Sequence, residues 1–156
     1  MATQFTLKDI LENAIRKEID SQLLYTSLSQ RVEDEAAKDA FQELVGQEKG
    51  HQDLLERYLR GEIKEGALSH EQVIDYKIAE QLDQPEIALD MKLQDVFLLA
   101  ADLEALAHEF YLSIAEIHPA GEVKGLLEGL ADQELKHKQR VEFLYTEVAF
   151  PQTDGG

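Results

Sequence analysis

Two short segments of this chain place a glutamate three residues before a histidine. The first is QEKGH, with Glu48 and His51, and the second is QELKH, with Glu134 and His137. Residues three apart on an α-helix face the same side, with Cβ atoms about 5–6 Å apart, so each pair can reach one metal ion together. Carboxylate and neutral imidazole, without thiolate, suit iron or manganese, with zinc as an alternative.

Two further glutamates extend these pairs into matching sets. In the first set a glutamate lies 30 residues before the Glu-x-x-His pair, and in the second set the separation is again 30. Adding 86 to each residue number converts the first set into the second, which indicates two copies of one helical hairpin about a pseudo-twofold axis. Each hairpin would then supply half of a two-metal site. The equivalent residues are Glu18 and Glu104, Glu48 and Glu134, and His51 and His137.

Four long segments carry the helical repeat of apolar residues that would hold these groups in place. None of them shows the two-residue alternation of a strand. Thr6 can cap the first segment, with Asp9 three residues on in the position of a capping box. The predicted helices cover residues 6–32, 35–60, 91–117 and 122–148.

The connections between these segments are unequal. Short joints link the first helix to the second and the third to the fourth, which makes each pair antiparallel neighbours. About 30 residues, 61–90, separate the second helix from the third, and within them 69–82 predicts a short helix capped by Ser69. We therefore predict an all-α fold, a ferritin-like four-helix bundle with one long crossover.

The apolar stripe of each predicted helix is interrupted near its middle by one of the four glutamates, and in two helices also by a histidine. Uncompensated carboxylates facing one another would repel strongly, since a like-charge pair at about 4 Å costs on the order of 4 kcal/mol at an effective dielectric near 20. Two divalent cations would cancel four carboxylate charges. The pattern therefore favours a buried di-metal centre over solvent-facing carboxylates.

Composition limits the other classes of function. The 156 residues include no cysteine and carry a formal charge of −17, which excludes thiolate sites and argues against nucleic-acid binding. The N-terminus lacks signal-peptide features, and no apolar run approaches the roughly 20 residues that span a bilayer. We expect a cytoplasmic protein that binds no membrane, with one domain over 1–150 and a disordered tail at 151–156.

The motifs resemble those of rubrerythrin-like members of the ferritin-like di-iron superfamily across nearly the whole chain. In that family a glutamate followed seven residues later by tyrosine marks the first and third helices, here EIDSQLLY and EALAHEFY, and Glu-x-x-His marks the second and fourth, here EKGH and ELKH. The stretch QLDQPEIALDMKLQDVFLLA also resembles the family's entry to the third helix. The resemblance implies that Glu48 and Glu134 bridge two iron ions, that Glu18 and His51 complete one ion, and that Glu104 and His137 complete the other.

Two departures from the family pattern limit what the resemblance implies. Rubrerythrins proper carry a further glutamate three residues after the third-helix ligand, where this chain has Ala107. The family's peroxide-driven ligand exchange is therefore not implied here. A rubredoxin module, which holds iron through cysteines, is also absent because the chain has no cysteine.

Several polar residues near the motifs need a separate interpretation. Tyr25 and Tyr111 obey the 86-residue shift and are candidates to hydrogen-bond the site carboxylates. Glu109 lies about 140° around the helix from Glu104, and His108 is interpreted as a flanking polar residue rather than a ligand. We expect His70, in the crossover, and His118, in a loop, to be exposed to solvent.

Three functions fit these residues. The leading hypothesis is an oxidoreductase that uses two iron ions to reduce hydrogen peroxide or O₂, with a role in oxidative stress and an external electron-donor protein as partner. The second is a ferroxidase or iron-sequestering subunit, and the third is a bundle with a structural metal that serves partner binding. We also expect a homo-oligomer, with a dimer favoured.

Overall fold

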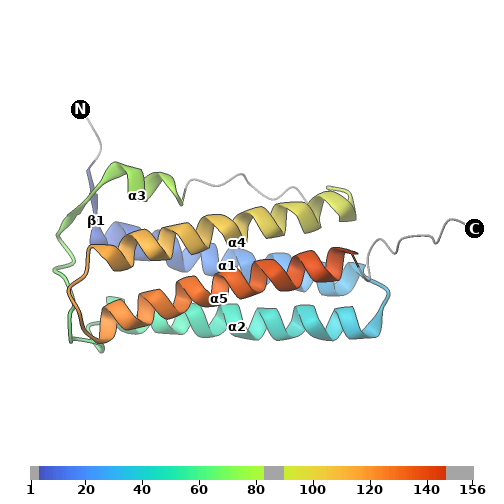
Figure 1. Cartoon of the computed structure of the whole chain (residues 1–156), viewed down its shortest axis with the longest axis horizontal. Helices are drawn as coiled ribbons and strands as arrows, with labels where there is room; N and C mark the ends of the chain where they lie inside the picture. Colours follow the sequence, from blue (N-terminus) through green and yellow to red (C-terminus); the bar gives the residue numbers. More distant parts are fainter. Residues whose placement is uncertain (1–3, 83–89, 147–156) are drawn as a thin grey trace, which may run out of the picture.

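The computed structural model describes residues 4–82 and 90–146 and confirms the predicted all-α bundle. The expected tail at 151–156 and the end of the fourth predicted helix, 147–148, lie outside the described residues. Figure 1 shows the four long helices side by side, with the crossover passing over one end. Their bounds are α1 Leu7–Arg31, α2 Glu35–Leu59, α4 Leu93–Glu116 and α5 Glu122–Leu144.

The first two helices begin at side-chain caps. The Thr6 hydroxyl accepts from the backbone N–H of Asp9 at 3.2 Å, and the Asp9 carboxylate accepts from the Thr6 N–H at 3.1 Å, which confirms the predicted capping box. Asp34 caps α2 by accepting from the Ala37 N–H at 2.9 Å. These caps fix where α1 and α2 start, and hence the height of Glu18 and Glu48 along the bundle.

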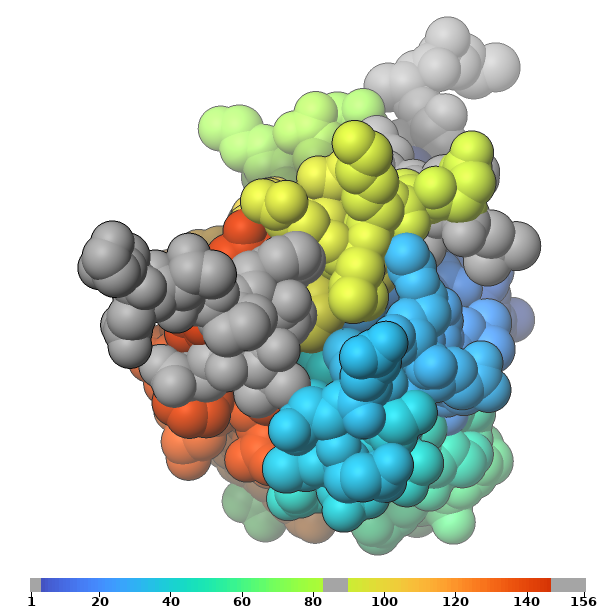
Figure 2. Space-filling view, turned by 90° about the vertical axis from the view of Figure 1, so that its right-hand side faces the viewer, coloured from blue at the N-terminus to red at the C-terminus, as the bar shows by residue number. Residues whose placement is uncertain are grey.

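The two hairpins pack into a bundle whose helices follow one another in the order α4, α1, α2, α5 around its axis. Figure 2 looks along that axis, with α4 (yellow) above, α1 (blue) to the right, α2 (cyan) below and α5 (red) to the left. The tightest helix contacts lie within each hairpin, between α1 and α2 and between α4 and α5. The hairpins therefore meet along two seams, α1/α4 and α2/α5.

The short helix predicted within the crossover begins later than expected. Residues Val73–Ile74 form a short strand, β2, antiparallel to β1 at Phe5–Thr6, and the short helix α3 covers only Tyr76–Glu80. The cap is Asp75, which accepts from the Lys77 N–H at 2.9 Å. The prediction of Ser69 as the cap is wrong: its hydroxyl accepts from Glu71 in a local turn at 3.3 Å.

Two glycines let the loops at one end of the bundle turn and touch. Gly61 has φ +78 and follows the last residues of α2, where a left-handed conformation ends a helix. A Cβ on Gly121 would lie 2.9 Å from the carbonyl oxygen of Glu65, which accepts from the Val123 N–H at 3.1 Å. The crossover is thereby tied to the start of α5.

The core has two apolar layers, one toward each end of the bundle. One contains Leu11, Leu55 and Ile114, and the other contains Phe41 and Phe97, whose rings meet edge to face at 5.4 Å between centroids. The predicted glutamates and histidines form a polar layer between them. On α5, Leu127 is fully buried, whereas its neighbour Leu126 is only half-buried.

Among residues 4–82 and 90–146, every helix is too short or too polar to cross a membrane.

Candidate metal centre

All six residues singled out by their spacing come together in the polar layer. One glutamate enters from each of the four long helices, and a histidine joins it from α2 and from α5. Each of the six is at most 3% exposed, in a protein with a formal charge of −17. Burial of this kind is costly for charged groups unless they are paired or bind metal. The six are Glu18, Glu48, His51, Glu104, Glu134 and His137.

The six residues divide into two groups of four that share two glutamates. In each group, ligand atoms, one from each residue, lie within 4.8 Å of one another. Glu48 and Glu134 belong to both groups, so the geometry has two adjacent positions with two carboxylates between them. The groups are Glu18, Glu48, His51, Glu134 and Glu48, Glu104, Glu134, His137.

Each histidine points its Nδ1 atom at glutamates from both hairpins. His51 Nδ1 is 2.6 Å from Glu134 Oε1 and 3.5 Å from Glu18 Oε2. His137 Nδ1 is 2.7 Å from Glu48 Oε1 and 3.8 Å from Glu104 Oε2. The two imidazole rings lie nearly parallel, 10° apart, with centroids separated by 5.5 Å. The two positions are therefore related as the 86-residue shift predicts.

Unsatisfied polar atoms show that this cluster fits metal ions. Among the described residues, five of the six members carry a buried oxygen or nitrogen without a hydrogen-bond partner, and these atoms face the same space. His51 Nδ1 and Glu134 Oε1 are close, but the angles between them do not make a hydrogen bond. Buried polar groups are rarely left unpaired unless they serve a ligand or catalysis. The atoms are Glu18 Oε2, Glu48 Oε2, His51 Nδ1, Glu104 Oε2 and Glu134 Oε1.

The electrostatics separate the two shared glutamates from Glu18. Burial, reinforced by the charges of neighbouring glutamates, raises the pKa of Glu48 and of Glu134 well above the ordinary value. Burial also opposes ionisation of Glu18, but its close contacts with Glu48 and His51 leave its pKa below the ordinary value. In the metal-free protein, protons on Glu48 and Glu134 thus relieve the repulsion between the buried carboxylates.

The two histidines also differ. Burial and the nearby His51 lower the pKa of His137 to about 4, which keeps that imidazole neutral near pH 7. Burial of His51 acts in the same direction, but the nearby carboxylate of Glu18, whose Oε2 lies 3.5 Å from His51 Nδ1, raises the pKa of His51 above its ordinary value. A neutral imidazole is the form that binds metal.

Two tyrosines hold the outer glutamates across the α1/α4 seam. Tyr25 of α1 donates a hydrogen bond to Glu104 of α4, and Tyr111 of α4 donates to Glu18 of α1 at 2.5 Å. Burial and the nearby carboxylates raise the pKa of both phenols well above the ordinary value, so both stay protonated donors. The sequence singled out both tyrosines, but not that each serves the opposite hairpin.

Two glutamines beside the site were missed by the sequence analysis. Gln133 Oε1 lies 2.6 Å from His51 Nε2, and Gln47 Oε1 lies 2.6 Å from His137 Nε2. The signal that could have found them is the same shift, because 47 plus 86 is 133. Each glutamine directly precedes a site glutamate in the chain.

The other four polar residues that the sequence singled out lie outside the metal centre. Glu109 is exposed, and His108 has its Nδ1 2.6 Å from the carbonyl oxygen of Ala131. The prediction that His118 is exposed is wrong: it is 3% exposed, with Nε2 2.7 Å from the Tyr58 hydroxyl and Nδ1 2.7 Å from the Ile114 carbonyl oxygen. His70 is half-buried against the ring of Tyr58, so its predicted exposure is also wrong.

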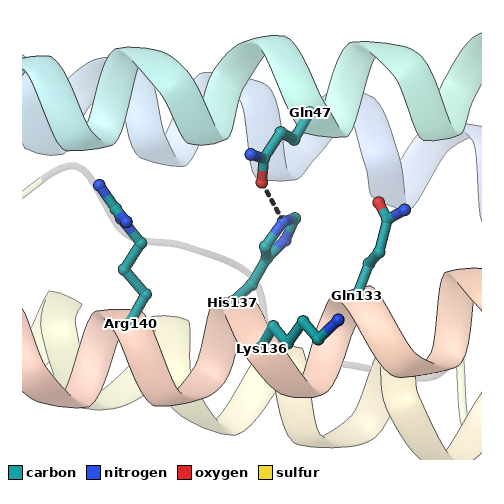
Figure 3. A pocket seen from close by; sticks show the side chains of 5 residues that line it. All are labelled: Gln47, Gln133, Lys136, His137 and Arg140. Carbon is teal, nitrogen blue, oxygen red and sulfur yellow. Dashed lines mark hydrogen bonds between the residues drawn. The ribbon is translucent and has the colours of Figure 1, made fainter.

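The two seams differ in how they open to solvent near the centre. On the α1/α4 seam a cavity of about 20 Å³ reaches Glu18, Glu104 and Glu134, and Lys17 and Ala107 also line it. On the α2/α5 seam a wider groove of about 440 Å³ passes over the outer edge of His137 (Figure 3). Its lining residues are Gln47, Gln133, Lys136, His137 and Arg140.

Fold and site together define a ferritin-like carboxylate bundle built for two metal ions. The model of the rubrerythrin family matches residues 9–89, which is 81 of the 156 residues, and the chain belongs to that family. A search of curated proteins finds no match.

Two solved structures share the architecture over nearly the whole chain. A candidate ferritin-like diiron-carboxylate protein from Thermotoga maritima superposes with a TM-score of 0.72 at 21% identity, covering 94% of this chain and 99% of the other. A hypothetical protein from Pyrococcus furiosus superposes with a TM-score of 0.69 at 26% identity, covering 90% and 89%. Both support the ferritin-like fold.

Proposed function

We propose that this protein is a rubrerythrin-type di-iron oxidoreductase that reduces hydrogen peroxide or O₂ with electrons from an external donor. The observation that carries the proposal is the pair of four-residue groups that share Glu48 and Glu134 and leave five buried atoms unpaired. Membership of the rubrerythrin family supports the same centre.

The donor set favours iron, with manganese and zinc as alternatives. Four carboxylates and two imidazoles, with no thiolate in the chain, are ligands of intermediate to hard character. Two ferrous ions bound here would supply two electrons, which together with two protons convert one hydrogen peroxide to two waters.

The protein's own residues would prepare the site for this reaction. In the proposed assignment, Glu48 and Glu134 would be shared by both ions, Glu18 and His51 would hold one ion, and Glu104 and His137 would hold the other. Tyr25 and Tyr111 hold the two outer carboxylates by hydrogen bonds that cross the bundle. Buried donors of this kind keep ligands oriented while the charge of the centre changes.

The small cavity on the α1/α4 seam supports a small oxidant. Its volume of about 20 Å³ lies next to Glu18 and Glu104, and a cavity of roughly 10–15 Å³ already holds one water molecule. Molecules of the size of O₂ or hydrogen peroxide match this space. A larger organic substrate would require the two helices to separate.

The electrons must come from outside the chain. The sequence contains no cysteine to hold an iron–sulfur or rubredoxin-type centre. We propose a small donor protein with a basic patch, because the formal charge of −17 would speed its encounter with this surface.

A stopped-flow experiment tests the proposal. Protein reconstituted with two ferrous ions per chain is mixed with excess hydrogen peroxide, and the appearance of ferric absorption is followed. We expect one rapid oxidation and then arrest until a reduced donor protein is supplied. Sustained peroxide consumption without any reductant would contradict the proposal.

The same preparation tests the ferroxidase alternative. Ferrous iron is added in tens of equivalents under air, and soluble ferric iron and particle size are measured. Steady growth of a ferric mineral in a large particle would show that iron is the substrate, and would replace the oxidoreductase proposal.

A further inference from the structure

Two glutamines that are not in either four-residue group contact the outer edges of both site histidines. Figure 3 shows Gln47 descending from α2 and His137 rising from α5, joined by a hydrogen bond across the groove. The equivalent contact joins Gln133 of α5 to His51 of α2, also at 2.6 Å. Each glutamine therefore holds the histidine of the other hairpin.

The chemistry of the amide oxygen decides what this contact does. An amide oxygen only accepts hydrogen bonds, so the Nε2 atom that meets it must carry a hydrogen. In a neutral imidazole, a hydrogen on Nε2 leaves the lone pair on Nδ1. Nδ1 is the atom that faces the carboxylates, 2.6 Å from Glu134 in His51 and 2.7 Å from Glu48 in His137.

We infer that Gln47 and Gln133 are positioning residues that fix Nδ1 as the metal-binding nitrogen of His137 and His51, each acting from the opposite hairpin. The inference rests on the metal centre of the proposed function and is independent of the redox reaction. Each metal position would then depend on the opposite hairpin through a glutamine as well as through the ligands themselves.

The location of the glutamines makes this role separable from folding. Both residues are exposed and line the groove on the α2/α5 seam, outside the two apolar layers of the core. Substitutions on the surface usually change stability by less than about 0.5 kcal/mol. An effect on the histidines can therefore be measured in a folded protein.

Nuclear magnetic resonance gives the direct test. The full chain, labelled with ¹⁵N in histidine and loaded with zinc, is examined by long-range ¹H–¹⁵N correlation, which distinguishes a protonated Nε2 from a protonated Nδ1. We expect Nε2–H and metal-bound Nδ1 in both His51 and His137. A metal-bound Nε2 in either ring would overturn the inference.

Substitutions test the dependence across hairpins. Gln47→Met and Gln133→Met each replace the amide with an apolar side chain of similar length, and zinc affinity is measured by competition with a chromophoric chelator. Loss of a partner outside the ligand shell typically weakens metal binding by about 10–100-fold, and we expect this for one of the two ions. In Gln47→Met the perturbed ring should be His137, and in Gln133→Met it should be His51.

Matched controls separate positioning from a general structural effect. Gln42→Met on α2 and Gln139→Met on α5 replace exposed glutamines elsewhere on the same helices and should leave both affinities within about threefold. Gln47→Glu and Gln133→Glu retain an acceptor for Nε2–H and should restore binding. Unchanged affinities in both methionine variants, or no recovery in the glutamate variants, would refute the inference.

These outcomes are distinguishable from failure of the proposed function. If ferrous protein does not react with peroxide but zinc binds with the expected pattern, the reaction is wrong and the positioning role holds. If zinc does not bind to the unmodified protein at all, both fail together.

Discussion

The two seams between the hairpins orient the candidate metal ligands with different side chains. On the α1/α4 seam, Tyr25 and Tyr111 are 1% and 2% exposed and donate hydrogen bonds to buried glutamates. On the α2/α5 seam, Gln47 and Gln133 are exposed and accept from the outer nitrogens of the histidines. Both seams thus orient ligands from the opposite hairpin, one inside the core and one at the surface.

On the α1/α4 seam the residues that orient ligands also stabilise the fold, whereas on the α2/α5 seam they contribute little to its stability. A tyrosine inside the apolar layers contributes packing as well as its hydrogen bond, because its ring fills core volume. A glutamine at the rim contributes almost only its hydrogen bond. Substitution of a tyrosine should therefore lower the free energy of unfolding more than substitution of a glutamine, although both residues hold ligands.

The largest effect is expected for a residue that both metal positions share. Glu48→Gln removes a carboxylate that belongs to both four-residue groups, so we expect the iron content after reconstitution to fall from two ions per chain to fewer than one. Glu104→Gln should leave one ion, because Glu104 belongs to one group. Elemental analysis measures both.

Exposed Glu109 supplies the control for these variants. Glu109→Gln should keep two ions per chain. Loss of an ion in Glu109→Gln, with both ions retained in Glu104→Gln, would show that Glu109 is the ligand on α4. It would contradict the assignment of Glu104 at the α1/α4 seam.

The second effect compares the seams directly through stability. Tyr25→Phe leaves a buried oxygen of Glu104 without its donor, which typically costs about 1–3 kcal/mol. Gln133→Met should change the free energy of unfolding by less than about 0.5 kcal/mol, since it lies at the surface. Urea unfolding of the metal-free proteins gives both values, and equal losses would remove the distinction between the seams.

The third effect tests whether the α1/α4 seam admits the oxidant. Ala107 lines the small cavity, so Ala107→Leu should fill it and slow the oxidation of ferrous protein by peroxide about tenfold or more, a barrier increase of about 1.4 kcal/mol. Lys136→Met, in the groove of the other seam, should leave that rate unchanged. Stopped-flow absorption measures both, and the reverse pattern would move the entry to the α2/α5 seam.

The smallest effect concerns protons. Burial raises the pKa of Glu48 and Glu134, so in the metal-free protein these carboxyls keep protons at pH values where an ordinary glutamate has lost them. Metal binding must displace these protons, and the affinity for zinc should rise with pH above the ordinary glutamate value of about 4.3. Calorimetry in buffers of different ionisation enthalpy would detect the released protons, and a zero count at pH 6 would contradict the raised pKa.

The sequence by itself determined the bundle and the six residues at its centre. Apolar repeats of 3.6 residues define helix faces, and Glu18, Glu48 and His51 occur on those faces with a second copy 86 residues on. Because both features depend only on local helix geometry, they could be read without knowing how the helices pack. The capping box at Thr6 and Asp9 is local in the same sense.

Only the tertiary structure decided which side chains meet across the two seams. The partners of Tyr25 and Gln47 depend on the rotation and axial offset of one hairpin against the other, which helical periodicity does not specify. The crossover was mispredicted for a related reason: pairing of Val73–Ile74 with Phe5–Thr6 competes with helix there, and the turn that results moves the cap from Ser69 to Asp75. His118 is buried because the folded end of the bundle brings the Tyr58 hydroxyl to its ring, a contact between residues 60 positions apart that no local pattern encodes.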